Sequence, residues 1–230
     1  MRSSRLAKLL IASVWAGLLV YAFAFAPPED ATVTRHLLAG SFGGSFGGLD
    51  ATVVAVWNTL GVVPLLYLSL LVPDGRRQRV WSWPFGLMMM AGGAFVLVPW
   101  LLLRTEEDSA ARPFALGMRL VRSAVFRWGI VVGLLGLFGY AVARGSIDGF
   151  AELFWHARLV HVMTLDLLLC AALLPYLIVK LRRPEDLLGE PAWARALLLV
   201  PLIGPALWNA LYYRPVPLEA LRQEKASPTE

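Results

Sequence analysis

Long hydrophobic runs separated by short polar segments dominate the pattern of the chain. Each run holds roughly 20 predominantly apolar residues, which is enough for a helix to cross a hydrocarbon core of about 30 Å. The runs are continuous and do not alternate between apolar and polar positions, as the strands of a membrane β-barrel do. The pattern therefore predicts an all-α, polytopic membrane protein with about six transmembrane helices in one bundle, at residues 9–26, 51–72, 85–103, 124–143, 159–179 and 193–213.

The composition agrees with a membrane location. Of 230 residues, 58% are hydrophobic and 16% are charged, whereas soluble domains carry about 25% charged residues. The net charge of +5 comes from Lys and Arg residues beside the apolar runs, which favours attraction to anionic lipid headgroups. No basic stripe interleaved with aromatic residues is present, so we do not expect nucleic-acid binding. The single cysteine, Cys170, excludes an intramolecular disulfide.

The first run has some features of a signal peptide. Residues 9–26 follow Arg2, Arg5 and Lys8, and small-residue patterns typical of cleavage sites occur near the end of the run. However, the run of 18 residues is longer than the usual signal core, and Pro27 follows it directly. We therefore expect an uncleaved membrane anchor.

The domain organisation is simple. Short loops join the runs, and no internal repeat is apparent in the sequence. We expect one transmembrane domain over residues 1–213 and a polar, disordered tail over residues 214–230. Within the fourth run, Gly129 and Gly133 form a GxxxG pair. Small residues at this spacing let helices approach closely in lipid, so the pair predicts a helix-packing face.

The distribution of basic residues bears on the membrane topology. With a cytoplasmic N-terminus, six crossings place 11 basic residues inside and 10 outside, so the positive-inside rule gives no preference. If residues 85–103 formed a re-entrant hairpin that turns at Gly92-Gly93, the count would become 15 inside and 6 outside. We still prefer six crossings, because the backbone at a hairpin tip must be buried by protein.

Asp166 is the most unusual residue within a hydrophobic run. At 1.5 Å per residue it lies roughly 10 Å into the fifth run. A charged side chain in hydrocarbon costs at least about 3 kcal/mol, so it normally faces a cavity, a partner or another helix. Three roles stay open: structural pairing, ligand binding or catalysis, and a protonated acid that is merely tolerated. Asp166 is the best candidate for a catalytic residue, and His161 is the next.

Other polar residues near the runs are candidates for ligand binding or helix packing. His156, His161 and Asp166 are spaced by five residues, or about 140° around a helix, and cannot converge on one metal ion. We therefore predict no metal site. Asn58 lies as deep in its run as Asp166 does, and the two side chains could meet if residues 85–103 were re-entrant. The remaining candidates are Arg158, Thr164, Pro201, Gly204 and Pro205.

Four segments resemble an uncharacterised family of multi-span membrane proteins from cyanobacteria and plant chloroplasts. They are VWNTLGVVPLLYLSLLVPDGR, WPFGLMMMAGGAFVLVPWLLLR, LVHVMTLDLLL and PLIGPALWNALYYRP, and the family patterns are FNxxGxWPxxY, DGR, WPF, HVMSLDF and PLxGPxxYLxxRP. The chain departs from these patterns at Val63, Thr164, Leu167 and Trp208. The matching residues include Asn58, Gly61, Pro64, Tyr67, Asp74, Gly75, Arg76, Trp83, Pro84, Phe85, His161, Asp166, Pro201, Gly204, Pro205, Arg214 and Pro215.

The resemblance implies an integral protein of a photosynthetic organism's membrane, either the bacterial plasma membrane or the thylakoid. It brings no activity with it. A shorter likeness, through an intramembrane Leu-Asp pair and a last run that contains Gly-Pro, links the chain to chloroplast proteins involved in neoxanthin formation.

Three hypotheses for function follow. The first is a non-catalytic factor that supports photosynthetic membrane complexes, with the lipid bilayer and photosynthetic membrane proteins as partners. The second is a protein that binds or modifies an isoprenoid pigment or lipid with Asp166 as the acid, since proton transfer to a polyene needs one carboxyl group in a dry pocket. Its cofactor would be a carotenoid or a chlorophyll. The third is a small transporter, which ranks last because neither repeats nor paired broken helices are apparent.

Overall fold

The computed structural model describes residues 2–74, 80–104, 120–121, 123–181 and 189–212, and over these residues it is helical without a strand. Five helices are long and apolar enough to cross a membrane, namely α1, α3, α4, α6 and α8. The expectation of an all-α, polytopic membrane fold is therefore confirmed. The helices in chain order are α1 (Arg2–Ala24), α2 (Ala31–Ser41), α3 (Ala51–Asp74), α4 (Ser82–Leu103), α6 (Ala124–Arg144), α7 (Ile147–His156), α8 (Arg158–Leu181), α10 (Ala192–Leu197) and α11 (Ile203–Tyr212). The expected tail, 214–230, lies outside the described residues.

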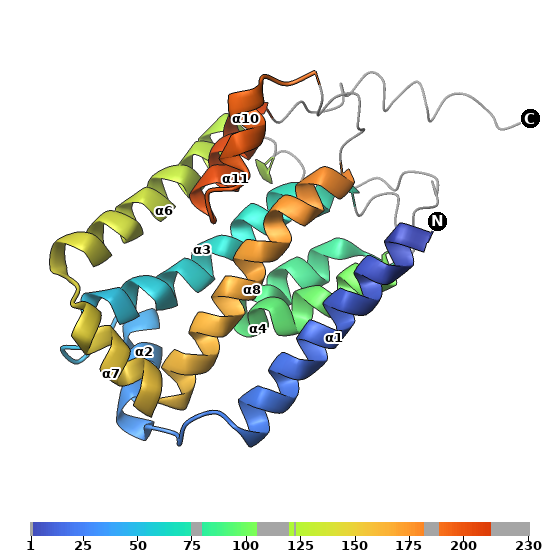
Figure 1. The fold of residues 1–230 in the computed structure, drawn as a ribbon. Helices are drawn as coiled ribbons and strands as arrows, with labels where there is room; N and C mark the ends of the chain where they lie inside the picture. The colour runs from blue at the N-terminus through green and yellow to red at the C-terminus, as the bar shows by residue number, and fades with distance from the viewer. Residues whose placement is uncertain (1, 75–79, 105–119, 122, 182–188, 213–230) are drawn as a thin grey trace, which may run out of the picture.

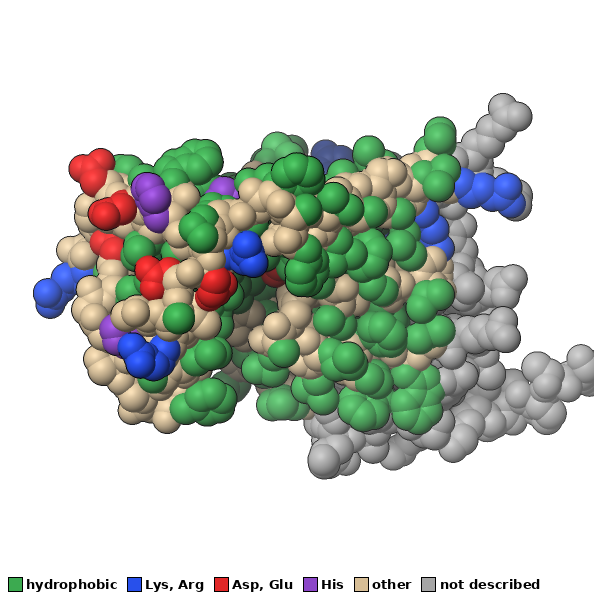
Figure 2. Space-filling model, turned by 90° about the horizontal axis from the view of Figure 1, so that it is seen from below, with side chains coloured by type: hydrophobic (Ala, Val, Ile, Leu, Met, Phe, Trp, Pro, Cys, Tyr) green, Lys and Arg blue, Asp and Glu red, His purple; other side chains and the backbone are tan. Residues whose placement is uncertain are grey.

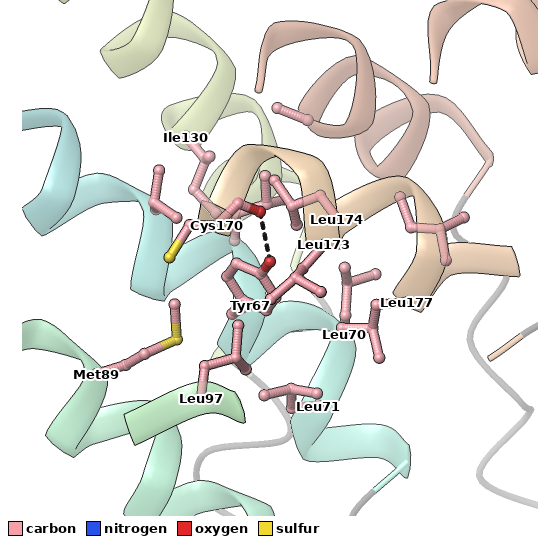
Figure 3. Close-up of a cluster of buried hydrophobic side chains, with 14 of the residues drawn as sticks. Tyr67, Leu70, Leu71, Met89, Leu97, Ile130, Cys170, Leu173, Leu174 and Leu177 are labelled. Atoms are coloured by element: carbon pink, nitrogen blue, oxygen red, sulfur yellow. Dashed lines mark hydrogen bonds between the residues drawn. The ribbon is translucent and has the colours of Figure 1, made fainter. Parts of the chain in front are cut away.

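Helix α3 lies at the centre of the bundle and contacts α4, α6 and α8 (Figure 1). Apolar side chains from all four helices form one buried core. Its middle is drawn in Figure 3, where the hydroxyl of Tyr67 on α3 donates a hydrogen bond of 2.7 Å to the carbonyl oxygen of Cys170 on α8. Because Tyr67 is fully buried, this bond satisfies a polar group that would otherwise destabilise the core.

The first residues of α1, the last residues of α3 and both ends of α4 lie together at one end of the bundle. Lys8 on α1 donates to the carbonyl oxygens of Leu102, at 3.0 Å, and Arg104, at 2.6 Å. The hydroxyl of Ser82, where α4 begins, donates to the carbonyl oxygen of Leu71 at 2.7 Å. We call this end the hairpin face. The opposite end carries the short helices α2 and α7, and we call it the α2/α7 face (Figure 1).

Helix α4 reverses its direction in the middle. Gly93 has φ 46° and ψ −130°, which are not helical angles. Trp100 donates its indole N–H to the carbonyl oxygen of Val80 at 3.4 Å, although 20 residues of straight helix would separate the two by about 30 Å. Figure 1 accordingly shows α4 as two arms side by side. The run 85–103, which we expected to cross the membrane as one helix, thus reverses fully, as in the re-entrant alternative.

Residues 193–213 are not the single spanning helix that the pattern predicts. The described residues of this run, 193–212, form α10 and α11, which are separated by a turn in which Leu202 has a positive φ of 59°. The rings of Trp193 and Tyr212 lie 5.7 Å apart, so this segment also turns back on itself. Proline cannot donate a helical hydrogen bond, and Pro201 in the turn accounts for part of the interruption.

Hydrogen bonds to main-chain groups fix the α2/α7 face. Asp50 precedes α3 and accepts from the N–H of Thr52 through Oδ1 at 2.8 Å and from the N–H of Ser146 through Oδ2 at 2.8 Å. It therefore joins the start of α3 to the start of α7. Charged and histidine side chains gather at this end of the molecule, whereas hydrophobic side chains cover its length (Figure 2). The long apolar surface fits contact with a lipid bilayer.

Candidate functional site

Asp166 lies on α8 and points at the reversal of α4. It is 5% exposed. Its Oδ1 atom accepts a hydrogen bond of 2.8 Å from the N–H of Ala94, the first residue after the turn. The second arm of α4 begins there, and the first N–H groups of a helix have no partner within the helix. Asp166 therefore acts as a helix cap that is supplied from a different helix.

Gly93 makes this approach possible. A Cβ atom added to Gly93 would lie 1.7 Å from Oδ2 of Asp166, which is far inside the van der Waals contact distance. The positive φ of Gly93 is a second reason for glycine, because L side chains rarely adopt this conformation. The sequence pair Gly92-Gly93 thus serves a close contact between α4 and α8 as well as a turn.

Other side chains of the protein surround the contact between Asp166 and Ala94. Trp15 on α1 donates its indole N–H to the carbonyl oxygen of Phe95 at 3.3 Å, one residue after the capped amide. Tyr67 and Cys170 form the hydrogen bond between α3 and α8 within the same buried core. In hydrocarbon, an unpaired N–H costs several kcal/mol. An aspartate at this depth therefore stabilises a chain reversal that the membrane interior would otherwise oppose.

His161 has a separate environment, at the contact between α1, α7 and α8. It is 3% exposed, and its ring stacks on Phe154 with 4.2 Å between the centroids. Nδ1 lies 2.8 Å from the carbonyl oxygen of Phe154, and Nε2 lies 2.9 Å from the hydroxyl of Tyr21. A carbonyl can only accept, so Nδ1 carries the hydrogen. In the neutral ring, Nε2 then accepts from Tyr21.

The other polar candidates of the fifth and second runs do not join Asp166. Asn58 donates to the carbonyl oxygen of Val54, and Thr164 donates to that of Val160, each four residues earlier in its own helix. No hydrogen bond joins Asn58 to Asp166 in the described part of the chain. These contacts keep both side chains within their helices.

Arg158 fastens the start of α8 to the segment after α1. Its Nε donates to the carbonyl oxygen of Pro27 at 2.9 Å, and its main-chain N–H donates to that of Pro28 at 3.0 Å. His156, two residues earlier, is exposed, and its Nδ1 lies 2.8 Å from the carbonyl oxygen of Glu152. Both residues therefore belong to the α2/α7 face and lie apart from the buried carboxyl group.

Pro201, Gly204 and Pro205 belong to the reversal between α10 and α11. A Cβ atom on Gly204 would lie 1.7 Å from the carbonyl oxygen of Leu197. Gly204 is therefore required for the two helices to approach. Pro205 is buried in the first turn of α11, where the missing N–H costs little. Gly204 and Pro205 therefore have a packing role, whereas Pro201 is exposed and lies in the turn itself.

Across the described residues, no group of three or more His, Cys, Asp or Glu side chains is placed to hold a metal ion. Asp166 and His161 share a helix, but each bonds to a different neighbour. Sequence reasoning identified Asp166 and the break at Gly92-Gly93 separately and missed that they meet. It also missed Tyr21, which no motif marks.

Comparisons with protein-family models, with curated proteins and with solved structures found no match to this chain. The assignment of a function therefore rests on the geometry and on the sequence motifs.

Proposed function

We propose that the chain is a non-catalytic integral membrane protein that supports the assembly or stability of other membrane complexes, and that these complexes belong to a photosynthetic membrane. The observation that carries the proposal is the use of Asp166 and His161, the two groups best suited to acid–base chemistry. Asp166 caps the second arm of α4, and both ring nitrogens of His161 have partners within the fold. The photosynthetic setting rests on the family motifs.

The outer surface of α6 adds support. Gly129, Gly136 and Gly139 each have open space where a Cβ atom would lie, and Val132 and Phe138 beside them are exposed. Small residues on a lipid-facing helix permit close approach by a helix of another protein. A protein that works through such contacts needs no catalytic group.

The substitution Asp166→Asn separates this proposal from an acid-catalysed reaction. Asparagine keeps an oxygen that accepts from the N–H of Ala94 and is a good helix cap, but it has no acidic proton. In a photosynthetic host that carries only the variant, we expect wild-type amounts of pigments and of membrane complexes on native gels. Asp166→Ala, which also removes the cap, is the matched control and should lower the amount of folded protein.

An altered pigment profile in a host with normally folded Asp166→Asn protein would overturn the proposal in favour of a pigment-modifying enzyme. A second test addresses α6: Gly136→Leu should reduce the amount of a co-purified complex. Gly17→Leu on α1 is its control, since Gly17 also has open space around it. Equal yields of complex from the two variants would exclude α6 as the contact helix.

A small transporter is the second candidate, because α4 and the α10–α11 segment are both broken and reversed. Broken helices form the substrate sites of many transporters. Suppose that a host with folded Asp166→Asn protein grows as poorly as a host without the protein, while its pigments and membrane complexes stay at wild-type amounts. This result would favour a transporter over both an assembly factor and a pigment-modifying enzyme.

A further inference from the structure

The order of the helices repeats. A long helix, a short helix at the α2/α7 face, a second long helix and a reversed segment occur as α1, α2, α3 and α4, and then again as α6, α7, α8 and α10–α11. The lengths agree closely: α2 and α7 have 11 and 10 residues, and α3 and α8 have 24 each. Helix α1 contacts α4, and α6 contacts α11.

A tryptophan closes each reversed segment by a bond to the second residue before it, through a main-chain carbonyl in the first segment and a side-chain carboxylate in the second. In the first, the indole N–H of Trp100 donates to the carbonyl oxygen of Val80, two residues before α4 begins. In the second, the indole N–H of Trp208 donates to Oε2 of Glu190 at 2.7 Å, two residues before α10 begins. Both tryptophans are at most 1% exposed. In each case a buried tryptophan of the returning arm reaches back to the entry of the hairpin.

Each reversed segment shares a buried hydrogen bond with a long helix of the other half. The α4 hairpin receives Asp166 from α8. Reciprocally, Asn209 on α11 donates through Nδ2 to the hydroxyl oxygen of Ser69 on α3 at 2.8 Å, and both side chains are fully buried. Such a pair of hydrogen bonds between the halves is expected if a two-fold axis relates them, because contacts across such an axis occur in pairs.

The α2/α7 face shows the same reciprocity. The segment after α1 meets the start of α8, where the N–H of Arg158 donates to the carbonyl oxygen of Pro28. The segment after α6 meets the start of α3, where the N–H of Ser146 donates to Asp50. The paired contacts therefore extend through the full depth of the bundle.

We propose that the chain consists of two parallel halves, related by a pseudo-two-fold axis along the membrane normal. Each half crosses the bilayer twice and adds one re-entrant hairpin. The chain then crosses four times, through α1, α3, α6 and α8, and both hairpins enter from the hairpin face. Parallel repeats with such an axis are a known architecture of membrane proteins. This inference is independent of the proposed function.

The charge distribution identifies the leaflet. In the four-crossing arrangement, 18 of the 21 Lys and Arg residues belong to segments attached to the hairpin face, and Arg35, Arg144 and Arg158 belong to the opposite face. Six crossings divide the basic residues 11 to 10, and one re-entrant hairpin divides them 15 to 6. Of the three arrangements, the four-crossing one obeys the positive-inside rule most strongly. The hairpin face therefore lies against the anionic lipids of the cytoplasmic leaflet.

Labelling of single cysteines tests the topology. Ser45→Cys, Ser109→Cys and Ser227→Cys are expressed in a bacterial host, and a membrane-impermeant maleimide is applied to inverted vesicles and to intact cells. The wild-type chain is the blank, because its one cysteine, Cys170, is fully buried. We expect Ser45→Cys to react only in intact cells, and Ser109→Cys and Ser227→Cys to react only in inverted vesicles.

Each competing topology gives a different pattern. Six crossings place residue 109 outside and residue 227 inside, so labelling of Ser109→Cys in intact cells would overturn the proposal. One re-entrant hairpin places residue 109 inside and residue 227 outside, so labelling of Ser227→Cys in intact cells would also overturn it. Reaction of Ser45→Cys in inverted vesicles would contradict the assigned leaflet.

Discussion

Gly93→Ala is the sharpest test of the contact between α4 and α8. A Cβ atom at residue 93 would lie 1.7 Å from Oδ2 of Asp166, so the carboxyl group must move away and its bond to the N–H of Ala94 is lost. Loss of a buried hydrogen bond to a carboxyl group costs about 1.5–3 kcal/mol. Alanine at φ 46° and ψ −130°, a conformation that glycine adopts far more readily than other residues, adds about 1–3 kcal/mol of backbone strain. We expect a total loss of about 2.5–6 kcal/mol.

The assay measures the free energy of unfolding of the purified protein in mild detergent, with circular dichroism as the signal. Gly61→Ala on α3 is the control, because a Cβ atom there meets nothing within 4 Å, and alanine favours the helix. It should be neutral or slightly stabilising. The same measurement on Asp166→Ala and on the double variant gives the coupling free energy between the two sites.

Strong non-additivity is the expected signature. Because both single variants remove the same hydrogen bond, the double variant should be only slightly less stable than Gly93→Ala, with a coupling of about 1.5–3 kcal/mol. Additive losses, or a Gly93→Ala protein as stable as the wild type, would refute the capping role of Asp166.

Three further predictions concern the other junctions. Gly204→Ala places a Cβ atom 1.7 Å from the carbonyl oxygen of Leu197; we expect a loss of about 1–3 kcal/mol in the same unfolding assay, and an unchanged midpoint would contradict the tight reversal. Tyr21→Phe removes the hydroxyl bonded to Nε2 of His161; a loss of about 1 kcal/mol is expected, and no loss would show that this bond does not stabilise the fold. Asp50→Ala leaves two main-chain N–H groups without their carboxylate partner; we expect a lower thermal midpoint and faster proteolysis near residue 146, and unchanged proteolysis would argue against the junction.

Much of the secondary structure follows from hydrophobic pattern alone. Four of the six predicted runs correspond to single long helices, α1, α3, α6 and α8, and the run 85–103 corresponds to the two helical arms of α4. The reason is that an apolar run in lipid must satisfy its backbone hydrogen bonds internally. The break at Gly92-Gly93 was also visible, since two glycines within an apolar run weaken a helix. The sequence does not predict the angle of the break, because a glycine pair permits a kink and a reversal equally.

The two reversals and the pairing across them depend on tertiary contacts. Residues 193–213 are apolar enough for one helix, and only the contacts of Trp193 with Tyr212 and of Trp208 with Glu190 reveal the hairpin. The proposed repeat is not visible in the sequence, because the two halves share the order of their helices and a set of paired contacts and not a sequence pattern. This symmetry consists of contacts between helices that are distant in the chain, and the order of hydrophobic and polar residues does not predict those contacts.

Asp166 illustrates what the sequence predicts and what only the tertiary structure decides. Its burial in a hydrophobic run made it conspicuous, since such a residue must find a polar partner. Its partner, the N–H of Ala94, lies 72 residues away and is an ordinary main-chain group that no side-chain motif identifies. The sequence by itself thus determined that the fold is helical, that it belongs in a membrane and that Asp166 needs a partner. The tertiary structure alone decided which group that partner is, because only folding places the opened helix end of α4 against α8.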